Sequence, residues 1–578
     1  MHDLLIRGGS LVDGSGKAAF TADIAIENGR IAEVGRISGT AHRVIDADGL
    51  LVTPGFVDVH THYDGQATWD PLLTPSCWHG VTTAVMGNCG VGFAPMHRDR
   101  REFLIQLMEG VEDIPGAVLA EGVDWDWESF PEYLDALDAK PRIMDLGTQL
   151  PHAALRYYVM GERGAAREVA NAQDLQRMAD LTEQAIRSGA LGFTTSRTVL
   201  HKTARGEYVP NYGAAARELN AIAVGLERAG SGVLQLLSDF EDPDAEFALL
   251  ADWVKASGGK PLSFTLVQRF EAPRQWRRLL ELIDRAQARG LSICGQVAPR
   301  AVGLLLGLQA TLHPFMTKPG YVEIAHLPLA ARVTRMRDPL LRARILAEPF
   351  AALPGNIPAF IADVLARLDR VFALGDPPDY EPGPEASVAA RAARIGCDPM
   401  QLIYDLLLER DGCELLFAPA ANYNDCDYEA TLTMLRHPHT IVGLGDGGAH
   451  CGSICDGSFP TFLLTHWTRD RKRGDLLPLE FAVRRYTRAP AELIGLNDRG
   501  LIAPGMKADI NLIDHSKLYL SPPAIVRDLP AGGRRLMQTA KGYAATIVSG
   551  EVVIEADQPT GALPGRLLRG QRHDPRAR

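Results

Sequence analysis

Residues 50–64 read LLVTPGFVDVHTHYD, an apolar run that ends in two histidines separated by one residue. In a β-strand, side chains two positions apart point to the same face, so the imidazoles of His60 and His62 lie together. Two neutral imidazoles on one face can bind a divalent ion such as zinc. A polar pair at a strand end is the simpler interpretation. The position of the pair directly after the PGFVD run favours the metal site.

Similar apolar runs recur through the middle of the chain, among them TTAVMGNCG, GALGFTTS, GVLQLLSD, PLSFTLVQ, LSICGQVA and HTIVGLGDGG. Amphipathic helical patterns such as DLQRMADLTEQAIRSG separate several of these runs. Alternating strands and helices indicate an α/β fold with parallel strands. We therefore predict a (β/α)8 barrel over residues 54–501, with its site at the carboxyl ends of the strands. A doubly wound open sheet is the alternative, although no GxGxxG fingerprint opens any unit.

The two ends of the chain share a different pattern. Period-two alternation in DLLIRGGSLVDG and ADIAIENGRIAEVG is matched near the other end by GLIAPGMKADINLID and YAATIVSGEVVIEAD. Short alternating runs that end in glycine-bearing turns are typical of antiparallel hairpins. Since chain ends often lie close together, we predict one small β-sandwich-like domain from residues 1–53 and 502–565.

Two segments interrupt the barrel pattern, near residues 97–140 and 315–400. Long excursions from a barrel are commonly lids or oligomer contacts, and we expect a homo-oligomer. The first segment carries Trp125 and Trp127. These tryptophans could cover an apolar acyl group or form a subunit contact.

Composition limits the possible partners and the location. The 578 residues carry a net charge of -11, so no basic face for nucleic acid is expected. The N-terminal residues MHDLLIRGG do not resemble a signal peptide, and no apolar run approaches the ~20 residues of a membrane span. The eight cysteines lack zinc-finger spacing. We expect no membrane partner and a cytoplasmic protein with reduced thiols.

Two further residues follow predicted strands and carry reactive groups. Asp446, in VGLGDGGAH, could contact a metal ion and take a proton from the attacking water, or it could serve only a turn. Cys89, in VMGNCGVGFAP, could be a thiolate ligand or an inert buried cysteine. Their positions beside the His60 and His62 signal favour the catalytic and ligand roles.

Taken together, PGFVDVHTHYD, GNCGVGFAP, GALGFTTS, GDGGAH and PGMKADINLID resemble the D-aminoacylase branch of the amidohydrolase superfamily over almost the whole chain. The resemblance implies removal of the acyl group from N-acyl-D-amino acids, with zinc bound by histidines and a cysteine. It also implies that His60, His62, Cys89 and Asp446 occupy metal-site positions and that Asp446 is the general base.

The sequence departs from this family at the fifth and sixth strands, each of which carries a metal-binding histidine in D-aminoacylases. The corresponding runs here, GVLQLLSDF and PLSFTLVQR, contain none. Their polar groups belong to Gln235, Ser238, Asp239, Thr265 and Gln268. We therefore expect one Zn2+ per chain, at the side of His60, His62 and Asp446. The departure leaves the acyl group, the amine portion and the stereochemistry of the substrate open.

Several other residues follow predicted strands and are candidates for substrate binding. The planar fork of Arg197 suits a carboxylate, or it forms a surface salt bridge. Asn422 and Tyr423 in PAANYND could hydrogen-bond the scissile carbonyl or shape their loop. His201 and His450 are active-site candidates, with His152 a weaker one. Three histidines that adjoin proline are expected to be structural: His313, His437 and His439.

The expected function is hydrolysis of a non-peptide amide bond in an N-acyl amino acid or a related N-acyl compound, by metal-activated water. A cyclic amide or lactone hydrolase would use the same chemistry and is the first alternative. The second is a barrel that binds a ligand without catalysis. Retention of His60, His62 and Asp446 argues against this last interpretation.

Overall fold

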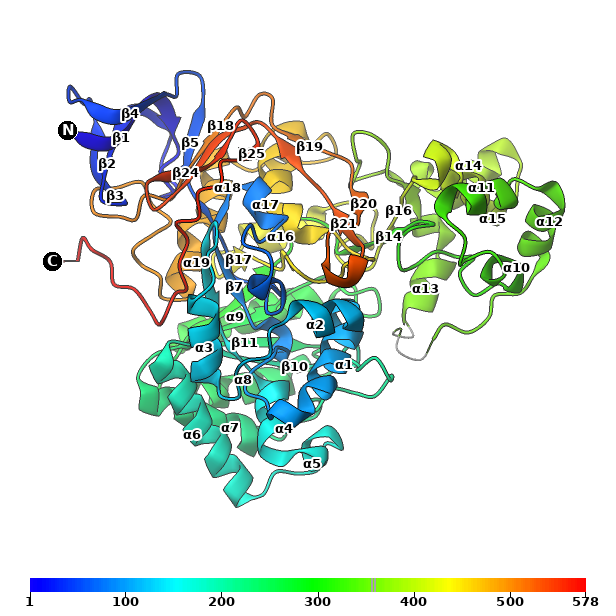
Figure 1. Ribbon diagram of the computed structural model, residues 1–578, viewed down its shortest axis with the longest axis horizontal. Coiled ribbons are helices and arrows are strands. Elements are labelled where there is room, and N and C mark those ends of the chain that lie inside the picture. The colour runs from blue at the N-terminus through cyan, green and yellow to red at the C-terminus, as the bar shows by residue number, and fades with distance from the viewer. Residues whose placement is uncertain (355–356, 358–359, 578) are drawn as a thin grey trace.

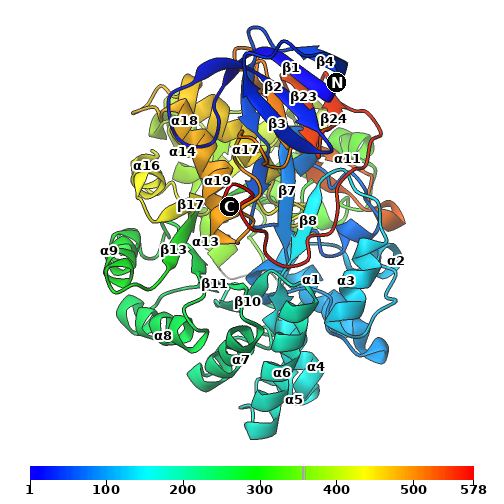
Figure 2. The same ribbon diagram turned by 90° about the vertical axis from the view of Figure 1, so that its left-hand side faces the viewer.

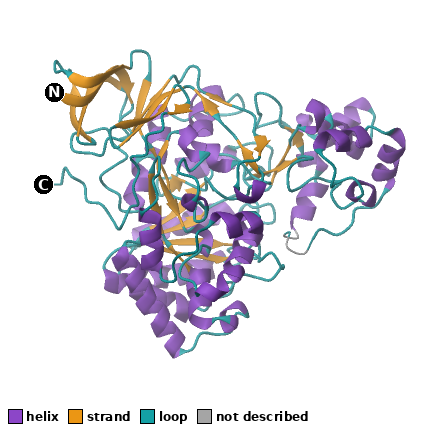
Figure 3. Cartoon of the chain, in the orientation of Figure 1, coloured by secondary structure: helices purple, strands orange, loops and turns teal. Residues whose placement is uncertain are grey.

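The computed structural model describes residues 1–354, 357 and 360–577 and has an α/β architecture (Figure 1). Its strands gather at the upper left and in the centre, whereas helices cover the lower part and form the lobe at the right (Figure 3). Both chain ends lie on the same side of the molecule. Among the described residues, no helix is both long enough and apolar enough to cross a membrane.

Strands from both ends of the chain form one nine-stranded sheet. The N-terminal part supplies β1 (His2–Leu11), β2 (Phe20–Glu27), β3 (Arg30–Gly35), β4 (Ala41–Asp46) and β5 (Leu51–Pro54). The C-terminal part supplies β18 (Ile510–Ile513), β23 (Tyr543–Val548), β24 (Glu551–Glu555) and β25 (Gln558–Pro559). The two parts meet where β5 pairs antiparallel with β18, Val52 opposite Leu512. Both side chains are buried, because the apolar positions of the alternating pattern face one core.

The middle of the chain supplies parallel strands in two sheets. One holds β6 (Phe56–Asp58), β7 (Val81–Met86) and β8 (Asp145–Thr148). The other runs in the order β9 (Leu150–Pro151), β10 (Gly192–Arg197), β11 (Val233–Ser238), β12 (Leu262–Thr265), β13 (Ile293–Val297) and β17 (Thr440–Val442). Only Gln149 separates β8 from β9. A parallel bridge from Thr61 to Gly447 joins the segment after β6 to the segment after β17.

Helices connect successive strands of the six-stranded parallel sheet and lie outside them (Figure 2). They are α6 (Ala172–Ser188), α7 (Ala216–Ala229), α8 (Pro243–Ala256) and α9 (Gln275–Ala288). Helix α6 begins with a reciprocal capping box between Asn171 and Asp174, which satisfies otherwise free backbone donors. Its apolar face, with Met178 and Ala185, is buried. Because crossovers of this kind bring the carboxyl ends of parallel strands to one edge, residues far apart in the sequence meet there.

The segment 97–140 folds into α1 (Arg101–Glu112), α2 (Gly116–Gly122) and α3 (Phe130–Asp138). Its tryptophans are buried: the exposed fraction is 8% for Trp125 and 1% for Trp127. The Trp127 indole N–H donates to the Phe93 carbonyl at 2.9 Å. The expectation of a substrate cover or an exposed subunit contact is therefore wrong for these two side chains, which pack in the core instead.

The segment 315–400 forms most of the helical lobe at the right of Figure 1. Its helices are α10 (Pro319–Val322), α11 (Leu329–Met336), α12 (Pro339–Ala347), α13 (Phe360–Ala366) and α14 (Val388–Ile395), and α15 (Pro399–Leu407) follows. The lobe has its own apolar core, which includes Phe315, Met336 and Tyr404. At its base lies a sheet of β14 (Gly303–Leu306), β16 (Leu416–Pro419) and β15 (Phe372–Ala373).

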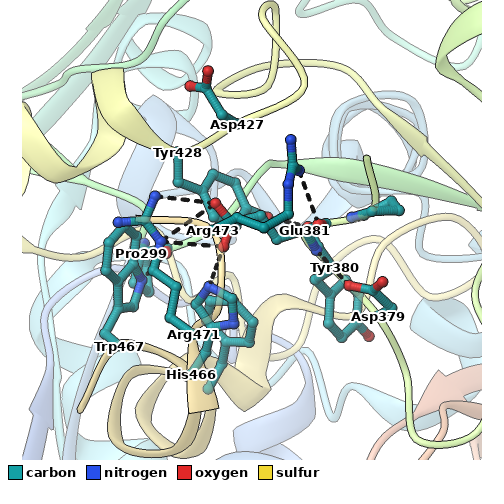
Figure 4. A network of polar contacts seen from close by, with 12 residues as sticks. Pro299, Asp379, Tyr380, Glu381, Asp427, Tyr428, His466, Trp467, Arg471 and Arg473 are labelled. Carbon is teal, nitrogen blue, oxygen red and sulfur yellow. Dashed lines mark hydrogen bonds and ion pairs between the residues drawn. The ribbon is translucent and has the colours of Figure 1, made fainter. Parts of the chain in front are cut away.

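A buried polar network ties Glu381, in the segment 315–400, to the π-helix Leu463–Asp470 and to the loop that follows it (Figure 4). The Glu381 carboxylate accepts a hydrogen bond from Arg471 at 3.0 Å and lies 2.8 Å from Nε2 of His466. Arg473 donates to the backbone carbonyl of Glu381 at 3.1 Å. The exposed fractions of the Arg471 and Glu381 side chains are 0% and 3%, so the pair is screened little by solvent.

Candidate metal centre

Four predicted site residues meet at the carboxyl ends of the parallel strands. The ligand atoms of His60, His62 and Cys89 all lie within 4.8 Å of one another. Cys89 Sγ is 3.3 Å from Nε2 of His60. Asp446 Oδ1 is 3.5 Å from Nε2 of His60 and 3.6 Å from Nε2 of His62. The two imidazoles and the thiol therefore form one cluster, and the Asp446 carboxylate contacts both imidazoles.

Backbone hydrogen bonds hold these side chains in place. The Asp446 N–H donates to the His60 carbonyl at 3.0 Å, and the His62 N–H donates to the Gly447 carbonyl at 2.8 Å. Cys89 and Asp446 have φ angles of 56° and 46°, in the left-handed region that side-chain-bearing residues rarely adopt. Such strain persists where surrounding structure fixes it, and it is concentrated at functional sites.

Burial sets the protonation of the centre. Burial lowers the pKa of His60 to about 4, so this imidazole is neutral and offers a lone pair. Burial raises the pKa of the Cys89 thiol to about 12, so a thiolate at this position needs a nearby cation. Burial also opposes ionisation of Asp446, but close contacts with His62 and His60 outweigh it and hold the pKa of this carboxyl below its usual range.

The donor set fits a zinc ion. Thiolate, imidazole and carboxylate groups are the ligands that tetrahedral zinc prefers. Within the described residues, the buried atoms His62 Nδ1, Glu112 Oε1 and Asp446 Oδ1 have no hydrogen-bond partner. A buried polar atom without a partner is costly, and for Asp446 Oδ1 a cation bound by the cluster would remove that cost.

Two residues outside the predicted set orient the histidines. Glu112 ends α1, and its Oε1 lies 3.3 Å from Nδ1 of His62, within ion-pair distance but without the geometry of a hydrogen bond. Gln296, on β13, has its Oε1 2.8 Å from Nδ1 of His60. Partners on the Nδ1 side fix the ring and leave Nε2 facing the centre. Glu112 follows no strand and belongs to no motif, whereas the strand-end position of Gln296 in LSICGQVA could have indicated it.

A cavity of about 560 Å3 opens over the centre and touches His60, His62, Cys89 and Asp446. The predicted residues His201 and His450 also line this cavity. His450 Nε2 is 3.7 Å from Glu112 Oε2 and 3.9 Å from Asp446 Oδ2.

The other predicted substrate contacts do not line the cavity. Arg197 pairs with Glu246 at 2.7 Å and donates to the Ala214 carbonyl, so most of its fork is occupied within the chain. The Tyr423 hydroxyl donates to the Pro382 carbonyl at 2.7 Å. Asn422 Oδ1 accepts from the Gln268 N–H at 2.7 Å. These three side chains hold loops together, which corrects the expectation that they meet the substrate.

The remaining histidines also lie outside the cavity lining. His152 is fully buried between Thr195, 2.8 Å from its Nδ1, and Glu218, 2.9 Å from its Nε2. His313 accepts from the Phe315 N–H at 3.2 Å, and His437 lies 3.2 Å from Asp284. The backbone carbonyl of His439 accepts a hydrogen bond from the Gly295 N–H. These contacts match structural roles.

Comparison with known proteins gives the family. A family model described as the amidohydrolase family matches residues 43–554. The chain belongs to the amidohydrolase family. This amidohydrolase is 28% identical to the D-aminoacylase of Alcaligenes xylosoxydans xylosoxydans, over 98% of this chain and 97% of the relative. It is 27% identical to the N-acyl-D-aspartate deacylase of the same organism, over 98% and 95% of the two chains.

Solved structures share the fold of this amidohydrolase. A D-aminoacylase mutant in complex with copper chloride superimposes with a TM-score of 0.65 at 23% identity, covering 98% of this chain and all of that one. An N-acyl-D-glutamate deacylase from Bordetella bronchiseptica, in complex with zinc and a phosphonate inhibitor, superimposes with a TM-score of 0.62 at 23% identity. The match covers 98% of this chain and 99% of that one. The predicted resemblance to the D-aminoacylase branch is confirmed, and so is the expectation of a hydrolase that acts on non-peptide carbon–nitrogen bonds.

In this amidohydrolase β11 and β12, the fifth and sixth parallel strands when β8 and β9 are counted as one, contribute no histidine. On β11, Gln235 Oε1 instead accepts from the backbone N–H of Cys89 at 3.2 Å and so supports the turn that carries the thiol. On β12, Thr265 lines the cavity and its hydroxyl has no hydrogen-bond partner among the described residues. The metal donors are thus concentrated on the His60, Cys89 and Asp446 side of the site.

Proposed function

We propose that this amidohydrolase uses one zinc ion per chain to remove the acyl group from an N-acyl amino acid or a related N-acyl compound. The observation that carries the proposal is the cluster of His60, His62 and Cys89, with Asp446 in contact with both imidazoles, in the lining of a cavity of about 560 Å3. The names of the relatives, D-aminoacylase and N-acyl-D-aspartate deacylase, support the choice of an N-acyl substrate.

The proposal includes a closed (β/α)8 barrel over residues 54–501, in which β8 and β9 act as one interrupted strand. The parallel order of the strands and the bridge from Thr61 to Gly447 support closure. It also includes the small β-domain of residues 1–53 and 502–565. We also propose that the protein is a cytoplasmic homo-oligomer. Its eight unpaired cysteines are compatible with that compartment.

The division of labour follows from the contacts. His60, His62, Cys89 and Asp446 would hold the zinc ion, which when bound supplies a Lewis acid that activates water and polarises the scissile carbonyl. Asp446 takes the proton of the attacking water and transfers it to the departing amine, because its carboxylate is ionised and reaches into the cavity. Gln296 and Glu112 keep the two imidazoles oriented through their Nδ1 atoms.

Amine release by the zinc-loaded protein tests the proposal. N-acyl-D- and N-acyl-L-amino acids with several acyl groups, and their amides, would be incubated with protein and the free amine quantified. Release that depends on zinc and disappears in Asp446→Asn is the expected result. A cyclic amide or lactone that is opened without release of a second fragment, while every N-acyl compound resists, would favour the cyclic-substrate alternative. Binding without turnover of any compound would favour a non-catalytic barrel.

A further inference from the structure

The cavity wall beyond the metal centre is largely apolar. It is built by the segments after β11 and β12, by β14 and by residues of the helical lobe. The apolar side chains include Leu237, Phe240, Val267, Leu279, Val302, Leu304, Leu312, Met316, Ile357, Phe360, Ile361 and Ile454. Mostly apolar walls with few polar groups are typical of sites that desolvate a large apolar part of the ligand. An acetyl group would leave most of this wall in contact with water.

Apart from the four metal-site residues and Glu112, which contacts His62, four carboxylates line the cavity: Glu109, Asp113, Asp239 and Glu271. Two histidines, His201 and His450, line it as well. Among the described lining residues, Arg269 is the sole arginine and no lysine is present. Arg269 donates to the backbone carbonyl of Asp239, and its Nε lies 3.8 Å from Glu271 Oε2.

An anionic ligand is poorly matched to this distribution of charge. A carboxylate on the substrate would meet an excess of like charges, and the one guanidinium is already close to an acid. Coulomb repulsion is stronger in a partly desolvated cavity than in water. A bound zinc ion would not reverse the balance, because Asp446 and a Cys89 thiolate would neutralise much of its charge. Unfavourable charge placement of this kind selects against one substrate class as effectively as contacts select for another.

We propose that the natural substrate is an uncharged N-acyl amide, with a bulky apolar acyl group and an amine portion that carries no carboxylate. The inference rests on the proposed function and narrows it from N-acyl compounds in general to this class. The acyl group lies along the apolar wall, and the uncharged amine portion avoids repulsion by the four carboxylates beyond the metal centre.

Matched substrates test the two parts of the inference separately. N-Phenylacetyl-D-leucine and N-phenylacetyl-D-leucinamide have nearly the same shape and differ in charge, and the L enantiomers form a second pair. N-Acetyl-D-leucinamide differs from the second compound in acyl size alone. With the zinc-loaded full chain, we expect kcat/KM about tenfold or more higher for the amide than for the acid. This difference in kcat/KM between amide and acid should become smaller as salt screens the charges. N-Acetyl-D-leucinamide should be a poorer substrate than N-phenylacetyl-D-leucinamide.

A charge-reversed variant links the preference to the cavity. Glu271→Lys should reduce the difference in kcat/KM between acid and amide, because it replaces a lining carboxylate with a cation. Glu281→Lys is the control: both glutamate side chains are 59% exposed, but Glu281 does not line the cavity. Equal or greater activity on the acid, or on the acetyl compound, overturns the inference and leaves the proposed function intact. Absence of amine release from every compound overturns the proposed function itself, and the inference with it.

Discussion

Glu112 Oε1 lies 3.3 Å from Nδ1 of His62, and the exposed fractions of the two side chains are 2% and 1%. The contact joins the last residue of α1 to the segment that follows β6, and it sits on the side of the imidazole away from the centre. Burial raises the pKa of Glu112 to about 7. A carboxylate in this position fixes both the orientation and the tautomer of a metal-binding imidazole.

Replacing Glu112 with glutamine should weaken zinc binding by about 10- to 100-fold, the usual effect of losing an outer-shell partner. Competition with a chelator measures the affinity. Glu109→Gln is the matched control, because Glu109 lies on the same helix and lines the same cavity but, among the described residues, accepts a hydrogen bond only from the Gly116 N–H. Equal affinities of the Glu112 variant and the wild type would show that the contact does not support the site.

Cys89→Ser should abolish the thiolate-to-metal charge-transfer absorption of the cobalt-loaded protein and weaken metal binding, because a serine hydroxyl is a poor ligand for this class of ion. The absorption spectrum reads out ligation directly, without an activity assay. Cys413→Ser, at an exposed cysteine outside the cavity, should leave the spectrum unchanged. A charge-transfer band that survives in Cys89→Ser would remove this thiol from the ligand set.

Asp446→Asn should lower kcat by roughly 10²- to 10⁴-fold, the range expected for loss of a general base. His60, His62 and Cys89 remain in this variant, so zinc should still be bound. Amine release and metal content measured on the same preparation separate the two effects. A kcat within a few-fold of the wild type would assign proton transfer to another group.

The sequence was most informative where a motif lies at a strand end. His60, His62, Cys89 and Asp446 each follow an apolar run, and parallel strands bring such ends together. The period-two pattern likewise predicted the strands that pair near both chain ends. These features follow from local periodicity, which a single sequence shows, together with the general rule that the carboxyl ends of parallel strands meet at one edge.

Contacts made by insertions and long side chains could not be predicted in the same way. Glu112 reaches the site from α1, whose docking depends on tertiary packing and leaves no spacing in the sequence. Arg197 is the last residue of β10, but its partner Glu246 lies on α8, and this ion pair occupies the guanidinium within the chain. Trp125 and Trp127 entered the core because the insertion is compact and packs onto Phe93.

The buried pair of Glu381 and Arg471 should be important for stability. Glu381→Ala would leave the Arg471 charge buried with only the more exposed Glu429 beside it. Removing one partner of a buried pair costs roughly 3–5 kcal/mol, so the urea midpoint should fall clearly. Asp411→Ala is the control, because the Arg337–Asp411 pair is largely exposed and should contribute little. Equal midpoints for the two variants would contradict the role assigned to the network.

Zinc content tests the central claim most directly. Freshly purified wild type and the double variant His60→Ala/His62→Ala would be compared by inductively coupled plasma mass spectrometry, with folding of both checked by circular dichroism. The account predicts about one zinc per wild-type chain and its loss from the folded variant. A folded wild type that takes up no metal even when zinc is supplied would contradict the metal centre and the hydrolytic function built on it.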